Sequence, residues 1–267
     1  MKNRIFLAAL SLLALTAAHT ADAGTRAAST LQLTIPSGSF ESVLPVAPTI
    51  KEVPVASFRI DESPVTNEEF LRFVSVHPQW RRDRVAHVFA DTEYLRHWQG
   101  TEAIHREQRR QPAVHVSWFA ASAYCEARGA RLPTWHEWEY VAAASTTARD
   151  ARNVEQWRQS ILTWYSRPAR GALPNVAQTV PNYYGVRDLH GVVWEWVEDL
   201  NAMLVSSDNR EQSSGNDLRF CGSGALTMEQ KENYATLMRI AMLSSMQARY
   251  TSGTMGFRCA TDLGAMQ

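Results

Sequence analysis

The chain has 267 residues, of which 45% are hydrophobic, so it is long enough to bury a sizeable core in one or two domains. Its 27 basic and 27 acidic residues give a formal net charge of zero, which argues against an electrostatic partner such as nucleic acid or a membrane surface. Nine tryptophans are many for this length, and they suit both a core and a binding site.

The first 23 residues have the pattern of a secretory signal. Lys2 and Arg4 precede a short apolar stretch at 5–18, and Ala21-Asp22-Ala23 is an A-x-A cleavage pattern. The apolar stretch is too short for a membrane span, and no later run of about 18 apolar residues follows it. We therefore expect a periplasmic or secreted protein without a membrane span after cleavage. A membrane anchor that stays uncleaved is the alternative.

The rest of the chain is predicted to form one domain. Residues 24–30 are small and polar and predict a flexible start, whereas 31–264 carry regular patterns. Alternation over 31–40, interrupted by Pro36-Ser37-Gly38, predicts a strand and a turn, and 53–60 predict another strand.

Helix starts are the clearest local signals. Thr66 followed by Glu69, and Thr134 followed by Glu137, are capping boxes, in which each side chain bonds the other residue's backbone N–H. Ser117 is placed to cap a further helix. Between these helices, residues 79–112 are polar and basic, which indicates a solvated surface insertion with helical pieces. Residues 145–180 are predicted to be irregular.

Five segments, in this order, resemble the formylglycine-generating enzyme (sulfatase-modifying factor) family. They are "VTNEEFLRF" at 65–73, "PAVHVSWFAASAYC" at 112–125, "RLPTWHEWE" at 131–139, "PNYYGVRDLHGVVWEW" at 181–196 and "GFRCA" at 256–260. The resemblance implies an α+β fold: one loop-rich domain, distantly similar to C-type lectins. It is closest in character to an exported branch that lacks the copper cysteines, similar to members used in pyoverdine maturation or found beside nitrite reductase systems.

The resemblance implies a structural calcium ion at the "VVWEW" stretch. In the family, the glutamate of this motif and backbone carbonyls are the ligands, which here would be Glu195 with the carbonyls of Val192 and Val193. Val192 replaces an asparagine of the family pattern, so one side-chain oxygen is lost. The alternative is that Glu195 accepts backbone N–H bonds with no ion. The family's second calcium site is expected to be absent, because 170–180 contain no acid.

The three cysteines are Cys125, Cys221 and Cys259. An oxidising compartment favours one disulfide and one remaining thiol, and composition leaves the pair open. The resemblance implies that Cys125 pairs with Cys259.

The family's copper site is missing from the sequence. Formylglycine generators bind copper(I) through two cysteines between "RGGS" and "GFR", and residues 222–258 contain none. The family's route to formylglycine is therefore not expected. Cys221 with Met238, Met242 and Met246 is an alternative copper(I) set, but methionines at this spacing more often fill a core.

Iron has no regular ligand pattern either. Some relatives are non-haem iron enzymes whose histidines come largely from a separate helical domain, and this chain lacks that domain. His87, His97, His105 and His115 follow no ligand spacing, although a site of two histidines and one carboxylate remains an alternative in space. The sequence thus supports neither copper nor iron.

Two functions remain in competition. The first is an exported, oxidoreductase-like maturation factor for a peptide or a siderophore-like, peptide-derived product. The second is a non-catalytic, monomeric module that binds a peptide or accompanies a periplasmic metalloenzyme. The resemblance places Cys221, Ser223 and Thr254 in the pocket as candidate catalytic residues, with Trp196 and Arg258 shaping it.

Overall fold

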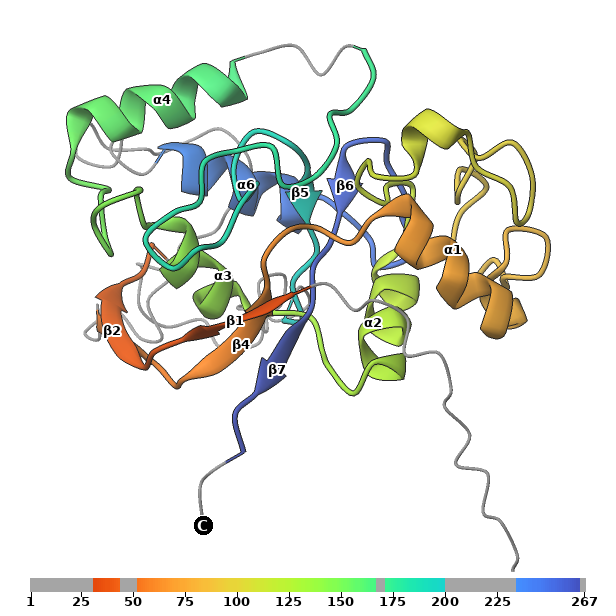
Figure 1. Ribbon diagram of the computed structural model, residues 1–267, viewed down its shortest axis with the longest axis horizontal. Helices are drawn as coiled ribbons and strands as arrows, with labels where there is room; N and C mark the ends of the chain where they lie inside the picture. The colour runs from red at the N-terminus through yellow and green to blue at the C-terminus, as the bar shows by residue number, and fades with distance from the viewer. Residues whose placement is uncertain (1–30, 44–51, 167–170, 200–233, 265–267) are drawn as a thin grey trace, which may run out of the picture.

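The computed structural model describes residues 31–43, 52–166, 171–199 and 234–264. The predicted signal at 1–23 and the predicted flexible start at 24–30 lie outside these ranges. A three-stranded antiparallel sheet joins the two ends of the described chain (Figure 1). Its order is β1 (Gln32–Ile35), β4 (Phe58–Asp61) and β7 (Ala260–Asp262).

A second, two-stranded antiparallel sheet is formed by the strands that lie between β1 and β4 in the chain. It consists of β2 (Gly38–Glu41) and β3 (Glu52–Val55), which pair from Gly38 with Val55 to Glu41 with Glu52. The strand and turn expected over 31–40 are therefore present, with a second strand after the turn. The single strand predicted for 53–60 is instead two strands, because its two halves pair with different partners.

The three predicted helix starts are confirmed. Thr66 precedes α1 (Asn67–Val76) and Thr134 precedes α3 (Trp135–Ala142), each in a complete capping box. Ser117 accepts a hydrogen bond from the third backbone N–H of α2 (Trp118–Ala127). Each of these caps satisfies N–H groups that have no partner inside their helix.

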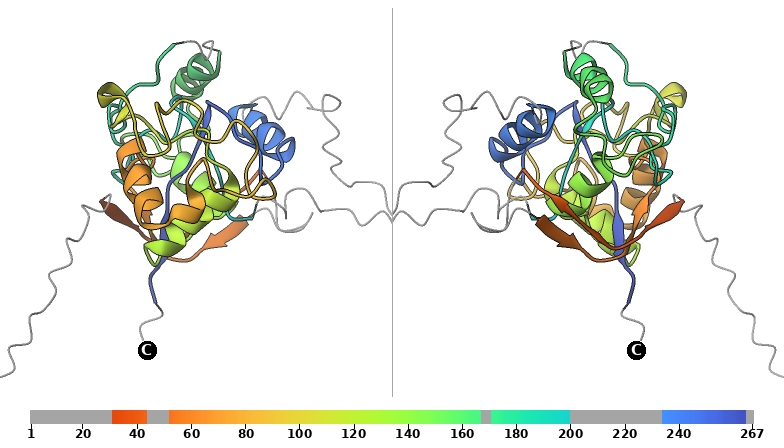
Figure 2. Two further views of the ribbon diagram at one scale, coloured as in Figure 1. Left: turned by 90° about the vertical axis from the view of Figure 1, so that its right-hand side faces the viewer. Right: turned by 90° about the vertical axis from the view of Figure 1, so that its left-hand side faces the viewer.

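The prediction that 145–180 are irregular is wrong, because this segment contains α4 (Glu155–Tyr165). Only Ile161 of α4 is buried, so its sequence shows no regular spacing of buried hydrophobic residues that would indicate a helix. Contacts with α6 (Tyr234–Ser244) and with the chain near Gly191 support it instead. Gly191 has a φ of 82°, and a Cβ there would come within 2.9 Å of the Trp164 ring. Figure 2 shows α4 at the end of the molecule opposite the sheet.

The segment 79–112 is more than a solvated surface. It carries the 3-10 turn η2 (Arg106–Gln108), and η1 (Pro78–Trp80) overlaps its start. Tyr94, Leu95 and Trp98 within it are almost fully buried in the core, which corrects the sequence prediction. Asp91 fastens the segment to the C-terminal part of the chain, since its carboxylate accepts bonds from the Thr251 N–H at 3.0 Å and hydroxyl at 2.5 Å.

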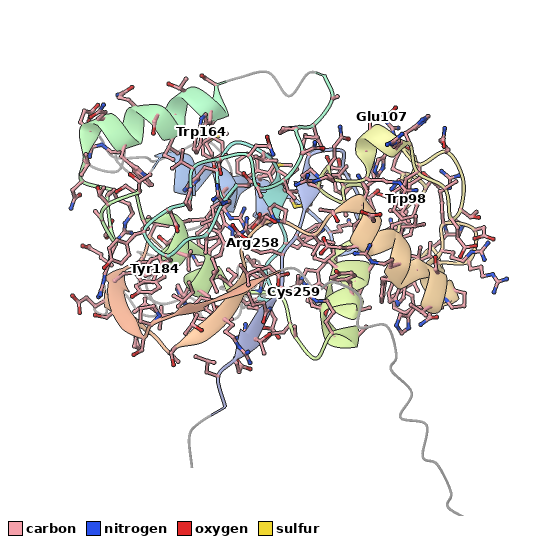
Figure 3. The ribbon with its side chains drawn as sticks, in the orientation of Figure 1. Trp98, Glu107, Trp164, Tyr184, Arg258 and Cys259 are labelled. Atoms are coloured by element: carbon pink, nitrogen blue, oxygen red, sulfur yellow. A yellow bond between two sulfur atoms is a disulfide. The ribbon has the colours of Figure 1, made fainter. Side chains whose placement is uncertain are left out.

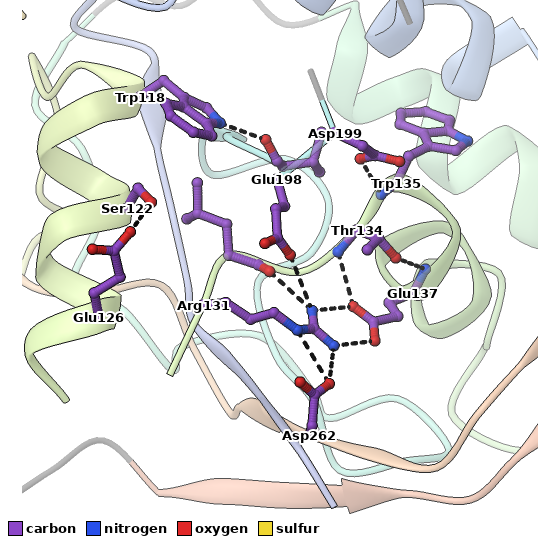
Figure 4. Close-up of polar contacts among 12 residues, drawn as sticks. Trp118, Ser122, Glu126, Arg131, Thr134, Trp135, Glu137, Glu198, Asp199 and Asp262 are labelled. Atoms are coloured by element: carbon purple, nitrogen blue, oxygen red, sulfur yellow. Dashed lines mark hydrogen bonds and ion pairs between the residues drawn. The ribbon is translucent and has the colours of Figure 1, made fainter. Parts of the chain in front are cut away.

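Arg131 ties α3 to the C-terminal strand (Figure 4). Its guanidinium donates to both carboxylate oxygens of Glu137 at 2.7 Å and to Asp262 of β7 at 2.5 Å. Glu198 lies 3.6 Å from the same group. Arg131 therefore links Glu137, which completes the capping box of α3, to strand β7 of the sheet.

A disulfide joins Cys125 of α2 to Cys259, directly before β7. This is the pair that the family resemblance implies, and both residues are fully buried. None of the described helices is long and apolar enough to cross a membrane.

Candidate functional site

The "WEW" stretch forms the centre of the domain. β5 (Trp194–Glu195) pairs in parallel with β6 (Met255–Gly256), which places Glu195 opposite Gly256. Glu195 is completely buried, and Arg258, two residues beyond β6, is completely buried as well. Figure 3 shows Arg258 at the middle of the molecule.

Glu195 and Arg258 form a two-point ion pair. Nη2 of Arg258 donates to Oε1 of Glu195 at 2.8 Å, and its Nε donates to Oε2 at 2.9 Å. Trp138 donates its indole N–H to Oε2 at 2.8 Å. The remaining N–H groups of Arg258 donate to the carbonyls of Asp61, Glu62 and Arg187. A buried charge pair is tolerated only when its hydrogen bonds are satisfied in this way.

A second arginine lies against the same group. Arg239 of α6 stacks on the Trp138 ring at 3.6 Å and donates to the backbone carbonyl of Glu195 at 2.6 Å. Burial lowers the pKa of Arg239 to about 10, so it still carries its charge at neutral pH. One guanidinium group thus pairs with the Glu195 carboxylate, and a second holds the backbone carbonyl of the same residue.

The carboxylate of Glu195 has a protein partner at both oxygens. Calcium needs several oxygen ligands. Oε1 and Oε2 of Glu195 both accept bonds from Arg258, so this ion pair competes with an ion for the carboxylate. Coordination by the carbonyls of Val192 and Val193 stays a prediction.

We expect calcium removal to leave the stability of the protein unchanged. Arg258 already neutralises Glu195, so an added cation would have to displace this buried guanidinium from the carboxylate. The measurement is Tm by calorimetry in EGTA and again after excess calcium. A fall of several degrees in EGTA that calcium reverses would contradict this and would assign an ion to the Val192 and Val193 carbonyls.

The other predicted site residues lie in several places. Trp196 is completely buried, and its indole N–H donates to the Val116 carbonyl at 2.9 Å. Trp196 and Arg258 thus belong to the core, and neither borders the cavity described next. Thr254 is half-buried, with its hydroxyl 3.0 Å from that of Ser252. Cys221 and Ser223 lie outside the described residues.

A cavity of about 330 Å³ opens between α1, the 79–112 segment and the loop before β6. Its walls are Asn67, His97, Glu107, Gln108, Gln111, Pro112, Val114, His115, Gly253 and the segment 171–173. Figure 3 shows Glu107 beside the start of α1, close to Trp98 and away from Arg258. Thr254 itself is not among the wall residues, although its neighbour Gly253 is.

The position of His97 is set by Asn67. The Asn67 amide nitrogen donates to the carbonyls of Gln108 and Pro112, at 3.0 and 3.2 Å, so its oxygen must be an acceptor. That oxygen receives the indole N–H of Trp98 at 3.0 Å and lies 3.0 Å from Nε2 of His97. Nε2 of His97 therefore carries the proton. Burial, with the nearby His115 and Arg82, lowers the pKa of His97 to about 3, so the ring is neutral and Nδ1 holds a lone pair.

His115 faces His97 across 5.3 Å between ring centroids. Its φ of 53° lies in the left-handed region, which costs energy for a side chain of this size. Two backbone bonds hold it there, from the His115 N–H to the Ser252 carbonyl and from the Leu95 N–H to the His115 carbonyl. Burial lowers the pKa of His115 as well. Nδ1 of each histidine is buried without a hydrogen-bond partner among the described residues.

Comparison with known proteins identifies the family. A family model described as the sulfatase-modifying factor enzyme 1-like domain matches residues 18–263. The chain belongs to this family. The α+β, loop-rich architecture agrees with that assignment.

The most similar curated relatives of this sulfatase-modifying factor domain include active and inactive members. Formylglycine-generating enzyme of Streptomyces coelicolor is 29% identical over 259 residues, covering 80% of this chain and 81% of the relative. Inactive C-alpha-formylglycine-generating enzyme 2 of Mus musculus is 28% identical over 256 residues, covering 80% and 78%. Among solved structures, PvdO from Pseudomonas aeruginosa is 19% identical with a TM-score of 0.48, covering 87% of this chain and 94% of that one.

Sequence reasoning missed the grouping of Asn67, His97 and His115 in this family member. Asn67 falls in the first family motif and His115 in the second, so both were visible as motif residues. His97 lies in the segment that the sequence predicts as solvated. The one available signal was the Trp98 beside it, since a tryptophan in a polar segment often marks a buried anchor.

Proposed function

We propose that the protein is an exported maturation factor that binds a peptide or a peptide-derived product in the cavity lined by His97 and His115, and acts on it as an oxidoreductase. The function does not include formylglycine formation by the copper-cysteine route. Residues 222–258 contain no cysteine, so the soft ligand pair of that route is lacking.

The observation that carries this proposal is the chemistry of the cavity wall. Neutral imidazoles, the side chains of Gln108 and Gln111, and the Glu107 carboxylate gather around one space of about 330 Å³. Amide and imidazole groups match the N–H and C=O groups of a peptide, and a concave site with a few convergent polar groups is typical of ligand binding. The Gln108 Oε1 atom is also buried without a partner among the described residues.

Export is supported by two features. The sequence begins with the predicted signal, and the disulfide between Cys125 and Cys259 is the kind of bond that persists in an oxidising compartment.

A non-catalytic binding module is the second candidate. Its support is that the same wall groups recognise a peptide by hydrogen bonds alone.

The test is affinity selection from a synthetic mixture of random twelve-residue peptides. We expect the wild-type protein to retain a defined subset, and Ala172→Trp to lose it, because Ala172 is an exposed wall residue whose enlargement fills the cavity. Ala86→Trp, at an exposed position outside the wall, is the matched control. Retained peptides are then incubated with the protein under air and weighed by mass spectrometry.

A change in peptide mass supports the oxidoreductase, and unchanged peptides support the binding module. Equal retention by the wild type and Ala172→Trp would contradict both, since the cavity would then not be the binding site.

A further inference from the structure

We propose that His97 and His115 form a binding site for one divalent transition-metal ion at the wall of this cavity. The proposal uses the same cavity as the proposed function, but it does not depend on peptide binding. The two histidines lie 18 positions apart in the sequence and belong to no ligand motif.

The first support is that a hydrogen bond to Asn67 fixes the ring orientation and the tautomer of His97. Metal-binding histidines usually donate their second ring N–H to an oxygen, which fixes the ring and the tautomer. Asn67 supplies this oxygen at 3.0 Å, and its own amide group is anchored to backbone carbonyls. The remaining nitrogen, Nδ1, is left with a lone pair and no protein partner among the described residues.

The second support is the position of His115. The centres of the two rings lie 5.3 Å apart and their planes are tilted by 30°, a separation short enough for one ion to bind a nitrogen of each ring. The backbone holds this residue in the left-handed region, a strained conformation that often accompanies a functional site. Gly253 packs against the Nε2 edge of this ring, since a Cβ there would lie 3.1 Å from Nε2, and Nδ1 is the nitrogen left without a partner among the described residues.

Two neutral imidazoles select the class of ion. Imidazole nitrogen suits zinc, copper, nickel, cobalt and iron, whereas calcium and magnesium prefer oxygen. Within the described ranges, no three histidine, cysteine or acidic side chains are grouped around one point. The described residues therefore supply two ligands, and water or a bound molecule completes the coordination from the cavity. Glu107 lines the same cavity.

The experiment is a titration with cobalt(II), whose visible absorption reports coordination. Tag-free protein carrying Cys221→Ser is the reference, because a free thiolate binds the same ions. We expect one equivalent of cobalt(II) to bind and zinc(II) to displace it. His97→Gln keeps a donor for Asn67 but removes Nδ1, and His115→Asn removes the imidazole while tolerating the left-handed backbone.

Each of these two substitutions should weaken cobalt(II) binding by about 10- to 100-fold or more. His87→Gln, which changes an exposed histidine outside the cavity, should leave it unchanged. A reference protein without a one-equivalent cobalt(II) spectrum, or equal binding by all variants, would overturn the proposal.

Nitrogen-15 NMR of the histidine-labelled reference protein tests the site without any histidine substitution, so its result does not depend on whether the variants fold. Zinc(II) should shift the Nδ1 signals of two histidines, and no shift would again overturn the site. Peptide retention is measured separately, so loss of the metal site and loss of the proposed function are distinguishable.

Discussion

Replacing Arg258 by methionine should destabilise the protein by about 3–5 kcal/mol, the usual cost of leaving one member of a buried ion pair without its partner. The substitution leaves the Glu195 carboxylate fully buried, with the indole N–H of Trp138 as the remaining hydrogen bond described for it. It also removes the donors to the carbonyls of Asp61, Glu62 and Arg187. Urea unfolding followed by tryptophan fluorescence measures the loss.

The matched control is Arg109→Met. Arg109 pairs with Glu68 at 3.1 Å, but both side chains are roughly half exposed. A surface pair of this kind contributes only about 0.2–1 kcal/mol. Equal effects of the two substitutions would contradict the assignment of Arg258 as the charge that neutralises Glu195. Glu195→Gln should also destabilise the protein, because it leaves two buried guanidinium groups with no carboxylate.

Replacing Cys125 and Cys259 together by alanine should cost about 4–5 kcal/mol in the chain-entropy account of cross-links. The disulfide closes a loop with a sequence separation of 134, so it restricts the unfolded chain strongly. It also ties α2 to the residue before β7, and so joins the middle of the chain to its end. Urea unfolding of the oxidised protein and of the double variant measures the difference.

Cys221→Ser is the control for this experiment, because it removes a thiol and keeps the cross-link. It should unfold at nearly the same urea concentration as the wild type. A double variant as stable as the wild type would mean that the disulfide adds no net stability, which would contradict the prediction.

The candidate site was only partly predictable. The "VVWEW" motif drew attention to Glu195, and "GFRCA" to Arg258, but nothing in either motif indicated that the two residues bond to each other. Thr254 was predicted in the pocket; its neighbour Gly253 lines the cavity described above. His97 and His115 were visible only as scattered histidines, because Asn67, the partner of His97, lies 30 residues away from it.

The sequence by itself determined the starts of α1, α2 and α3, because a cap and its helix lie within three or four residues and obey local rules. Its ordered motifs also determined the family and, through the resemblance, the pairing of Cys125 with Cys259. Only the tertiary structure decided that Glu195 pairs with Arg258, and that two histidines share a cavity. These contacts join residues far apart in the chain, and such contacts leave no periodic pattern because each depends on how whole segments pack.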